Sequence, residues 1–317
     1  MSFQIQGTGI CVPKKIVTND EMSAIVETSD EWIRQRVGIA QRHVCTTESV
    51  VDLAAGAAEA ALADAGVLPG ELDLILSATV SGDNVAPSIA CMVQSRIGAT
   101  CPAYEINAAC AAFLFLLETA AGYFARGKAT KILVIGAERL SGITDYTDRG
   151  TCVIFGDGAG AAVLIKGDGY LDSVQHVSGG DDVLLIPRGI GASPFYEREA
   201  IPPFIQMKGQ DTFRYAVSSI TADVTELLEK NGLTSEDIAF VVPHQANIRI
   251  LEFASRKLNI PMEKFVVNID RYGNTSSASI PIALDELAKS GKLKRGDKII
   301  LTAFGAGLAS AACLIIW

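Results

Sequence analysis

The sequence predicts an α/β protein with buried sheets, built from two related halves. Short β-branched runs recur between alanine-rich helical stretches, at residues 73–80, 131–137, 239–244 and 298–304. This alternation is typical of sheets that are covered by helices. An internal duplication and one strongly apolar segment indicate the same architecture.

The duplication appears in three pairs of segments. GVLPGELDLIL, from Gly66, resembles GLTSEDIAFVV, from Gly232, and KILVIGA, from Lys131, resembles KIILTAF, from Lys298. FGDGAGAAVLI, from Phe155, resembles FGAGLASAACLI, from Phe304. The two segments of the third pair are separated by fewer residues than the two segments of either other pair. The first half therefore holds extra residues between Lys131 and Phe155. An added loop often carries binding residues. We expect the halves to span residues 1–168 and 169–317.

Residues 108–125 read AACAAFLFLLETAAGYFA and contain a single charged residue, Glu118. A helix that is apolar on every side belongs inside a core. The segment is slightly short for a membrane span and carries an acid, and the N-terminus lacks the features of a secretory signal. We therefore expect a buried helix and no membrane-spanning segment.

Cys110 lies in the first turn of this expected helix. A helix start presents unpaired N–H groups and the positive end of the helix dipole, which stabilise a thiolate. The dipole contributes up to ~1.5 pKa units to a thiol of ordinary pKa ~8.5. Taken alone, a buried cysteine is more simply explained by packing.

Asn274 is the residue of the second half that the repeat places near Cys110 when the register of the paired segments is carried across. It lies in RYGNTSSASIPIALDELAKS, where NTSS supplies N-cap residues to an apolar helix. Two such helices meeting at a pseudo-twofold axis would bring Cys110 and Asn274 into one pocket. Gly-Asn is also a common turn pair, so Asn274 alone is equally explained by a turn.

His244 stands out among the three histidines because it ends the predicted strand in AFVVPHQAN, followed by the amides of Gln245 and Asn247. Ligands bind at such strand ends in open α/β sheets. A lone histidine is more often structural. His43 and His176 fit that simpler interpretation.

Composition excludes several classes of function. The 317-residue chain carries 36 acidic and 27 basic residues, a net charge of −9, and no basic block, so we expect no nucleic-acid binding. Seven scattered cysteines without CxxC spacing predict reduced thiols in a cytoplasmic protein, with no metal site. Neither GTG nor GDGAG completes a dinucleotide-binding motif, and we expect the glycines of FGDGAG and FGAG to allow close backbone approach.

Seven ordered motifs resemble β-ketoacyl-acyl-carrier-protein synthase III, the initiating condensing enzyme of dissociated fatty-acid synthesis. They are TSDEWIRQRVGI (28–39), INAACAAF (106–113), DRGTCVIFGDGAGAAVL (148–164), MKGQDTFRYA (207–216), VPHQANIRI (242–250), DRYGNTSSASIP (270–281) and AFGAGLASA (303–311). The resemblance runs essentially end to end. It implies a thiolase-like fold, in which duplicated halves form a five-layered αβαβα sandwich.

The resemblance implies that Cys110 is the nucleophile and that His244 and Asn274 complete a catalytic triad. Cys110 would accept an acyl group from acyl-coenzyme A, and malonyl-acyl carrier protein would then be decarboxylated and condensed with it. The backbone N–H groups of Cys110 and Ala306 would hold the oxyanion. No cofactor or metal is implied, because coenzyme A enters as part of the substrate.

Substrate contacts are also implied by the resemblance, together with a homodimer. The expected contacts are Trp32 and Arg149 around the adenine, Arg36 and Arg249 at the phosphates, Asn247 at the pantetheine arm, and Met207 and Phe213 along the channel. Arg149 falls inside the extra loop. A basic patch for acidic carrier protein would comprise Arg214, Arg249, Arg256 and Lys257, although a solvated charged face explains each of them equally well.

The chain departs from the family pattern at several positions. Ala112 and Ala306 replace frequent glycines, and AFGAGLASA lacks a frequent tryptophan. Ala86 stands where an aromatic residue often reaches across the dimer into the acyl pocket, so we expect a pocket that accepts primers larger than acetyl. The alternatives are a specialised-metabolism relative, a Cys/His/Asn thioester hydrolase and a non-catalytic homologue.

Overall fold

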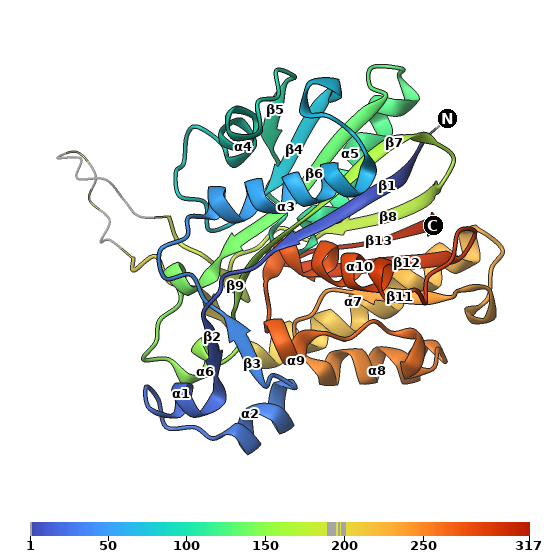
Figure 1. The fold of residues 1–317 in the computed structure, drawn as a ribbon. Helices are drawn as coiled ribbons and strands as arrows, with labels where there is room; N and C mark the ends of the chain where they lie inside the picture. Colours follow the sequence, from blue (N-terminus) through green and yellow to red (C-terminus); the bar gives the residue numbers. More distant parts are fainter. Residues whose placement is uncertain (1, 189–194, 196, 198–200) are drawn as a thin grey trace.

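Two mixed β-sheets form the centre of the protein in the computed structural model, which describes residues 2–188, 195, 197 and 201–317 (Figure 1). The first sheet has the order β1 (Ser2–Cys11), β7 (Asp157–Gly167), β6 (Lys131–Arg139), β4 (Leu74–Ala78), β5 (Ala103–Glu105). The second has the order β11 (Phe240–Pro243), β12 (Lys298–Gly305), β13 (Ala309–Ile316), β8 (Tyr170–Val177).

The two sheets share one pattern of pairing. In the first, β4 is parallel to β6, whereas β7 is antiparallel to both β6 and β1. In the second, β11 is parallel to β12, whereas β13 is antiparallel to both β12 and β8. The duplication read from the sequence is therefore present in the fold, and the chain passes from one sheet to the other between Gly167 and Tyr170.

Helices cover both sheets and fill the space between them (Figure 1). The helices α5 (Ala112–Ala125) and α10 (Ser279–Lys289) lie in the middle layer, α3 (Val50–Ala65) and α4 (Ile89–Ile97) cover the first sheet, and α7 (Gly209–Lys230) and α8 (Ile248–Leu258) cover the second. The resulting order is helix, sheet, helix, sheet, helix. The expected five-layered αβαβα sandwich is confirmed.

Helix α5 is buried between the sheets, as its composition predicts. Leu114, Leu116 and Leu117 are fully buried, and the lone charge of Glu118 accepts hydrogen bonds of 2.7 Å from the hydroxyls of Tyr170 and Ser173. No helix of the described chain is long and apolar enough to cross a membrane. The α-helix begins at Ala112, so Cys110 lies in the 3₁₀ turn 109–111 just before it.

The extra residues of the first half form the connection between β6 and β7, which spans 140–156 and contains α6 (Arg149–Cys152). The equivalent strands β12 and β13 are joined by residues 306–308 alone. Around this loop lie the short elements β2 (Ile16–Thr18), α1 (Asn19–Ser23), α2 (Asp30–Val37), β3 (Gln41–His43), β9 (Leu184–Leu185), β10 (Gln206–Met207) and α9 (Ile269–Tyr272). They form one side of the molecule beside the central sandwich (Figure 1).

The symmetry between the halves is closest at the two turns that precede the central helices, and it corrects the register expected from sequence. The turns Ala109–Ala111 and Ser276–Ala278 have the same spacing in the chain as the strand starts Lys131 and Lys298, and each turn begins with a φ of 48°. Asn107 and Asn274 both accept a hydrogen bond from the backbone of these turns.

The symmetry mate of Asn274 is therefore Asn107, and that of Cys110 is Ser277. The expected pairing of Cys110 with Asn274 was wrong by three residues, since the offset of 167 between the strand starts Lys131 and Lys298 pairs Asn107 with Asn274 and Cys110 with Ser277.

Glycines allow these turns to approach the strands. A Cβ atom on Gly136 of β6 would lie 2.3 Å from the backbone oxygen of Ser277, and one on Gly305 would lie 2.7 Å from the backbone nitrogen of Cys110. Real Cβ atoms do not come so close to backbone atoms. The expected role of the glycine in FGAG is confirmed.

We predict that Gly136→Ala lowers the free energy of unfolding by about 2 kcal/mol or more, because the backbone of the 276–278 turn would have to move. Gly122→Ala in α5 is the matched control, since nothing lies within 4 Å of the added Cβ. The control should raise stability by ~0.5–1 kcal/mol through helix propensity. Denaturant unfolding of both variants tests this, and equal stabilities would contradict it.

Candidate active site

A cavity of about 170 Å³ lies where the two halves meet, and the ends of four segments line it. Cys110 comes from the turn before α5, His244 follows β11, Asn274 follows α9, and Ala306 follows β12. Cys110 belongs to the first half, and the other three belong to the second. The fold therefore brings together all four residues that the sequence analysis selected for chemistry.

Cys110 is not activated by its environment alone. Cys110 as a whole residue is partly exposed. Its thiol group is nevertheless buried, and this burial raises the pKa of the thiol to about 12. That increase is larger than the ~1.5 pKa units that a helix start supplies. The dipole of the helix start is therefore too weak by itself to ionise this thiol at neutral pH.

His244 lines the same cavity as Cys110 and is almost fully buried. The residue is 1% exposed, its backbone N–H donates to the Thr302 carbonyl at 2.8 Å, and its ring lies edge-on to Phe304 at 5.3 Å between centroids. Burial lowers the pKa of the imidazole to about 3, so the ring is neutral at physiological pH. A neutral imidazole has one acceptor and one donor nitrogen. Its Nδ1 has no hydrogen-bond partner in the described part of the chain.

Asn274 is held by its backbone and by one side-chain atom. Its N–H donates to Ile154 at 2.9 Å, and its carbonyl accepts from Gly156 at 3.0 Å, so the chain is fixed against the extra loop. Its Oδ1 accepts from the Ser276 N–H at 2.8 Å. The amide oxygen is therefore occupied within the turn, and Nδ2 is the group of this side chain that remains for a ligand in the cavity.

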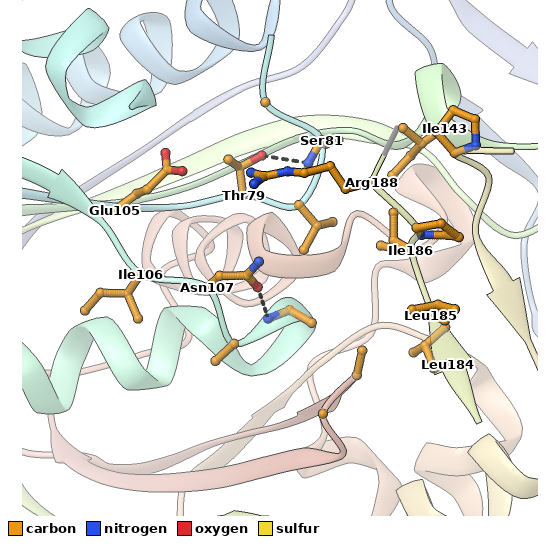
Figure 2. Close-up of a pocket in the computed structure, with 18 of the residues that line it drawn as sticks. Thr79, Ser81, Glu105, Ile106, Asn107, Ile143, Leu184, Leu185, Ile186 and Arg188 are labelled. Atoms are coloured by element: carbon orange, nitrogen blue, oxygen red, sulfur yellow. Dashed lines mark hydrogen bonds between the residues drawn. The ribbon is translucent and has the colours of Figure 1, made fainter. Parts of the chain in front are cut away.

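A larger outer cavity of about 950 Å³ adjoins the catalytic one (Figure 2). The two share a wall formed by Val80, Ala109, Leu184, Ile186 and Ala306. In Figure 2, Leu184, Leu185 and Ile186 lie along one side, and Asn107 lies above the start of α5. The outer cavity, which Ala109 but not Cys110 lines, thus offers a space much larger than an acetyl group on the far side of this wall.

Ala86 does not line either cavity. It is exposed on the loop before α4, whereas its neighbour Val85 lines the outer cavity. The position therefore lies at the outer edge of that space, and its contribution to an acyl pocket stays a prediction.

Three of the residues expected along the path of coenzyme A lie at its inner end, in the cavity that holds Cys110. Met207, Phe213 and Asn247 line the catalytic cavity. Asn247 is the N-cap of α8: its Oδ1 accepts from the Arg249 N–H at 2.9 Å, and its Nδ2 donates to the Arg36 carbonyl at 3.1 Å. The amide that was expected to contact pantetheine therefore already joins α8 to α2.

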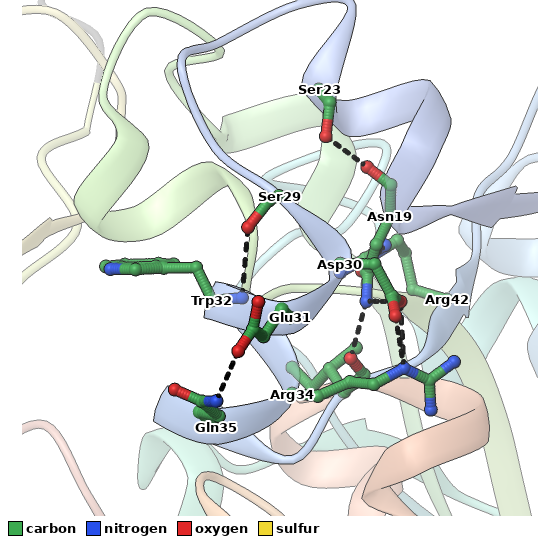
Figure 3. Close-up of polar contacts among 10 residues, drawn as sticks. Asn19, Ser23, Ser29, Asp30, Glu31, Trp32, Arg34, Gln35 and Arg42 are labelled. Carbon is green, nitrogen blue, oxygen red and sulfur yellow. Dashed lines mark hydrogen bonds and ion pairs between the residues drawn. The ribbon is translucent and has the colours of Figure 1, made fainter.

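Trp32 and Arg149 face each other at the surface end of this path. The guanidinium of Arg149 lies over the Trp32 ring, 5.1 Å from its centroid, and also donates to the Glu27 carbonyl at 3.0 Å. Figure 3 shows the Trp32 side chain pointing away from the polar network on the other side of α2. In that network the buried Arg42 donates to Asn19 at 2.9 Å and to the Val153 carbonyl at 2.8 Å, which fixes α1 and α2 against the extra loop.

The four residues expected to contact carrier protein are all exposed: Arg214, Arg249, Arg256 and Lys257. Two of them, Arg249 and Arg256, each lie over an aromatic ring. Arg249 lies over Phe213 at 5.9 Å, and Arg256 lies over Phe253 at 4.5 Å. The two rings meet edge to face at 5.7 Å. Arg214 is paired with Asp211 at 3.4 Å, and Lys257 is exposed on α8. Sequence reasoning missed Phe253. The available signal was an aromatic residue placed three residues before Arg256, on the same face of an expected helix.

Sequence reasoning also missed two polar residues buried beside Cys110. Ser276 lines the catalytic cavity, and Glu138 lies fully buried at the end of β6. An acid at the end of KILVIGAE, in an otherwise apolar strand, was the available signal.

Among the described residues, no group of three His, Cys, Asp or Glu side chains is arranged to hold a metal ion.

Comparison with known proteins places this arrangement in a family. The family model described as 3-oxoacyl-[acyl-carrier-protein] synthase III matches residues 104–179, and the model of its C-terminal part matches residues 228–317. The β-ketoacyl-[acyl-carrier-protein] synthase III of Clostridium acetobutylicum is 46% identical, covering 100% of this chain and 99% of its own length. That of Aquifex aeolicus is 44% identical, covering 99% of both chains.

The chain belongs to the 3-oxoacyl-[acyl-carrier-protein] synthase III family. Solved structures agree: the Aquifex aeolicus synthase III superposes with a TM-score of 0.94 at 43% identity, covering 99% of this chain and 100% of that one. The Thermus thermophilus synthase III gives 0.92 at 39% identity, covering 99% of both chains. The thiolase-like fold is thereby confirmed. The synthase is an acyl-transferring condensing enzyme that initiates fatty-acid synthesis.

We predict that decarboxylation of malonyl-carrier protein by the Cys110→Ser variant changes little between about pH 5.5 and about pH 7.5, because His244 stays neutral there. If the ring titrated at its ordinary pKa, its charged fraction would rise about tenfold towards the acidic end, and the rate would change with it because the charged ring is a stronger donor than the neutral one. Release of labelled carbon dioxide measures the step. A tenfold change in rate would contradict the assignment of a neutral imidazole.

Proposed function

We propose that the synthase uses Cys110 to accept an acyl group from acyl-coenzyme A and condenses that group with malonyl-acyl carrier protein. The products are 3-oxoacyl-acyl carrier protein, carbon dioxide and coenzyme A. One observation carries the proposal: in a chain of this family, Cys110, His244, Asn274 and Ala306 line one cavity. That set combines a nucleophile, a neutral base and hydrogen-bond donors.

In the first half-reaction, the acceptor nitrogen of neutral His244 takes the thiol proton as the Cys110 sulfur attacks the thioester carbon. The raised pKa of the thiol makes this assistance necessary. The backbone N–H groups of Cys110 and Ala306 hold the oxyanion of the tetrahedral intermediate. When the intermediate collapses, the coenzyme A thiolate leaves and takes the proton from His244.

In the second half-reaction, the malonyl group loses carbon dioxide, and the electron pair of the broken bond forms an enolate. An imidazole N–H of His244 and the Nδ2 group of Asn274 donate to the enolate oxygen. The enolate carbon attacks the acyl-cysteine, and the new oxyanion occupies the same backbone donors. Collapse expels the Cys110 thiolate, which recovers a proton from solvent. No resident cofactor or metal takes part in these steps.

The surface contacts complete the proposal. The adenine of coenzyme A binds between Trp32 and Arg149, which are both planar and already face each other. Arg36 and Arg249 meet the phosphates, and the pantetheine arm passes Asn247, Met207 and Phe213 to reach Cys110. Acidic carrier protein docks on Arg214, Arg249, Arg256 and Lys257, which lie exposed on α7 and α8. The synthase acts as a homodimer in the cytoplasm.

Trapping of the acyl-enzyme tests this function. With radiolabelled acyl-coenzyme A, the label should attach to the wild-type protein and leave as 3-oxoacyl-carrier protein when malonyl-carrier protein is added. Cys110→Ser should abolish attachment, and His244→Ala should slow both attachment and decarboxylation, because His244 takes the thiol proton in the first step and donates to the enolate in the second. Label released as free acid would instead identify a thioester hydrolase.

The size of the primer is a separate prediction. Since Ala86 replaces a larger side chain and the outer cavity measures about 950 Å³, we expect hexanoyl- and branched acyl-coenzyme A to be accepted as well as acetyl-coenzyme A. Ala86→Phe should reduce priming by the longer substrates on the order of tenfold and leave acetyl nearly unchanged. Strict acetyl selectivity of the wild-type enzyme would refute the prediction.

A further inference from the structure

Ser276 combines three unusual properties in the catalytic cavity. The residue is 3% exposed and lines the cavity together with Cys110, His244 and Asn274. Its backbone has a φ of +48°, a region that side chains other than glycine rarely adopt. Its hydroxyl makes no hydrogen bond of standard geometry within the described chain. A buried hydroxyl without a partner is costly, so its presence calls for a cause.

The pseudo-symmetry shows that the hydroxyl is not needed to build the turn. Ala109 is the symmetry mate of Ser276, has the same φ of 48°, and its N–H donates to Asn107 at 3.1 Å just as that of Ser276 donates to Asn274 at 2.8 Å. Ala109 has no hydroxyl. The backbone strain and the asparagine contact therefore belong to the turn itself, and the Ser276 hydroxyl is an addition made only in the second half.

The hydroxyl lies between two ionisable groups. It is close enough to the thiol of Cys110 and to the carboxyl of Glu138 to lower the pKa of each. Burial has the opposite and larger effect on Glu138 and raises its pKa. The two carboxyl oxygens already accept hydrogen bonds from Ser277 on one side and from Thr79, Val80 and Ser81 on the other, so the Ser276 hydrogen remains available to sulfur.

Glu138 also holds the turn in place. Its Oε1 is 2.7 Å from the hydroxyl of Ser277, and its Oε2 accepts from the Val80 N–H at 3.0 Å and from the Thr79 hydroxyl at 3.2 Å. Val80 is part of the wall between the two cavities. Glu138 therefore connects the turn that carries Ser276, in the second half, to Thr79 and Val80 of the first half, and these contacts hold Ser276 in position relative to Cys110.

We propose that Ser276 is a further catalytic residue, whose hydroxyl donates a hydrogen bond to the sulfur of Cys110 when it is a thiolate. The inference rests on the proposed role of Cys110 as nucleophile. The hydroxyl transfers no proton. It stabilises the same anion twice in each turnover, first as the thiolate attacks the acyl thioester and again as condensation expels it.

Two substitutions separate the hydroxyl from the backbone of the turn. Ser276→Ala removes the hydroxyl and keeps the strained φ, whereas Ser276→Gly removes both the hydroxyl and the strain. The probe is iodoacetamide, and carbamidomethylation of the Cys110 peptide is followed by mass spectrometry across a range of pH. Ser219→Ala is the control, because Ser219 is a buried serine of α7 whose hydroxyl donates to the Ala216 carbonyl outside the cavity.

Both Ser276 variants should alkylate about tenfold more slowly at neutral pH, with the midpoint of the pH profile moved upward, since hydrogen bonds to charged groups are strong. The control should match the wild type. Wild-type rates in both Ser276 variants would overturn the inference, and so would a change in the glycine variant alone, which would indicate backbone strain. If prior incubation with acyl-coenzyme A does not protect Cys110 of the wild type from alkylation, the proposed nucleophile itself is wrong.

Discussion

The close approach of two helix-start turns at the seam between the halves is the constraint on which the rest of the structure depends. The turns at Ala109–Ala111 and Ser276–Ala278 contact each other and the inner strands, and Gly136 and Gly305 leave the space they need. A side chain at either glycine would separate the turns from the strands. Because Cys110 belongs to one turn and Asn274 precedes the other, the packing of the core and the geometry of the site have a single origin.

The same packing decides the electrostatics of the site. Removal from water raises the pKa of the Cys110 thiol and lowers that of His244, so both groups are neutral in the free protein. Such a pair costs less to bury than a thiolate and an imidazolium, because each ion would lose its hydration. In the proposed reaction the same pair supplies an acceptor nitrogen for the thiol proton and a donor for an enolate oxygen, so charge separates only as substrate reacts.

The two halves use one scaffold for different tasks. The first half supplies Cys110, the proposed nucleophile, and its long connection 140–156 carries Arg149 onto the ring of Trp32. The second half keeps the short connection 306–308, which leaves Ala306 beside Cys110, and it adds a hydroxyl at Ser276 where its mate has only the methyl group of Ala109. The two halves therefore share the geometry of the turns where they meet, and they differ in the side chains that these turns place in the cavity.

The sequence by itself determined the α/β class, the duplication, the buried helix after Cys110 and the choice of Cys110, His244 and Asn274, because these follow from local composition and from motifs. Only the tertiary structure decided the dominance of burial over the helix dipole and the presence of Ser276 and Glu138 at the site. These properties depend on contacts between residues that are distant in the chain, such as Glu138 with Ser277. The pKa of the Cys110 thiol depends on how completely the folded chain excludes water from the sulfur, and a sequence motif does not determine that exclusion.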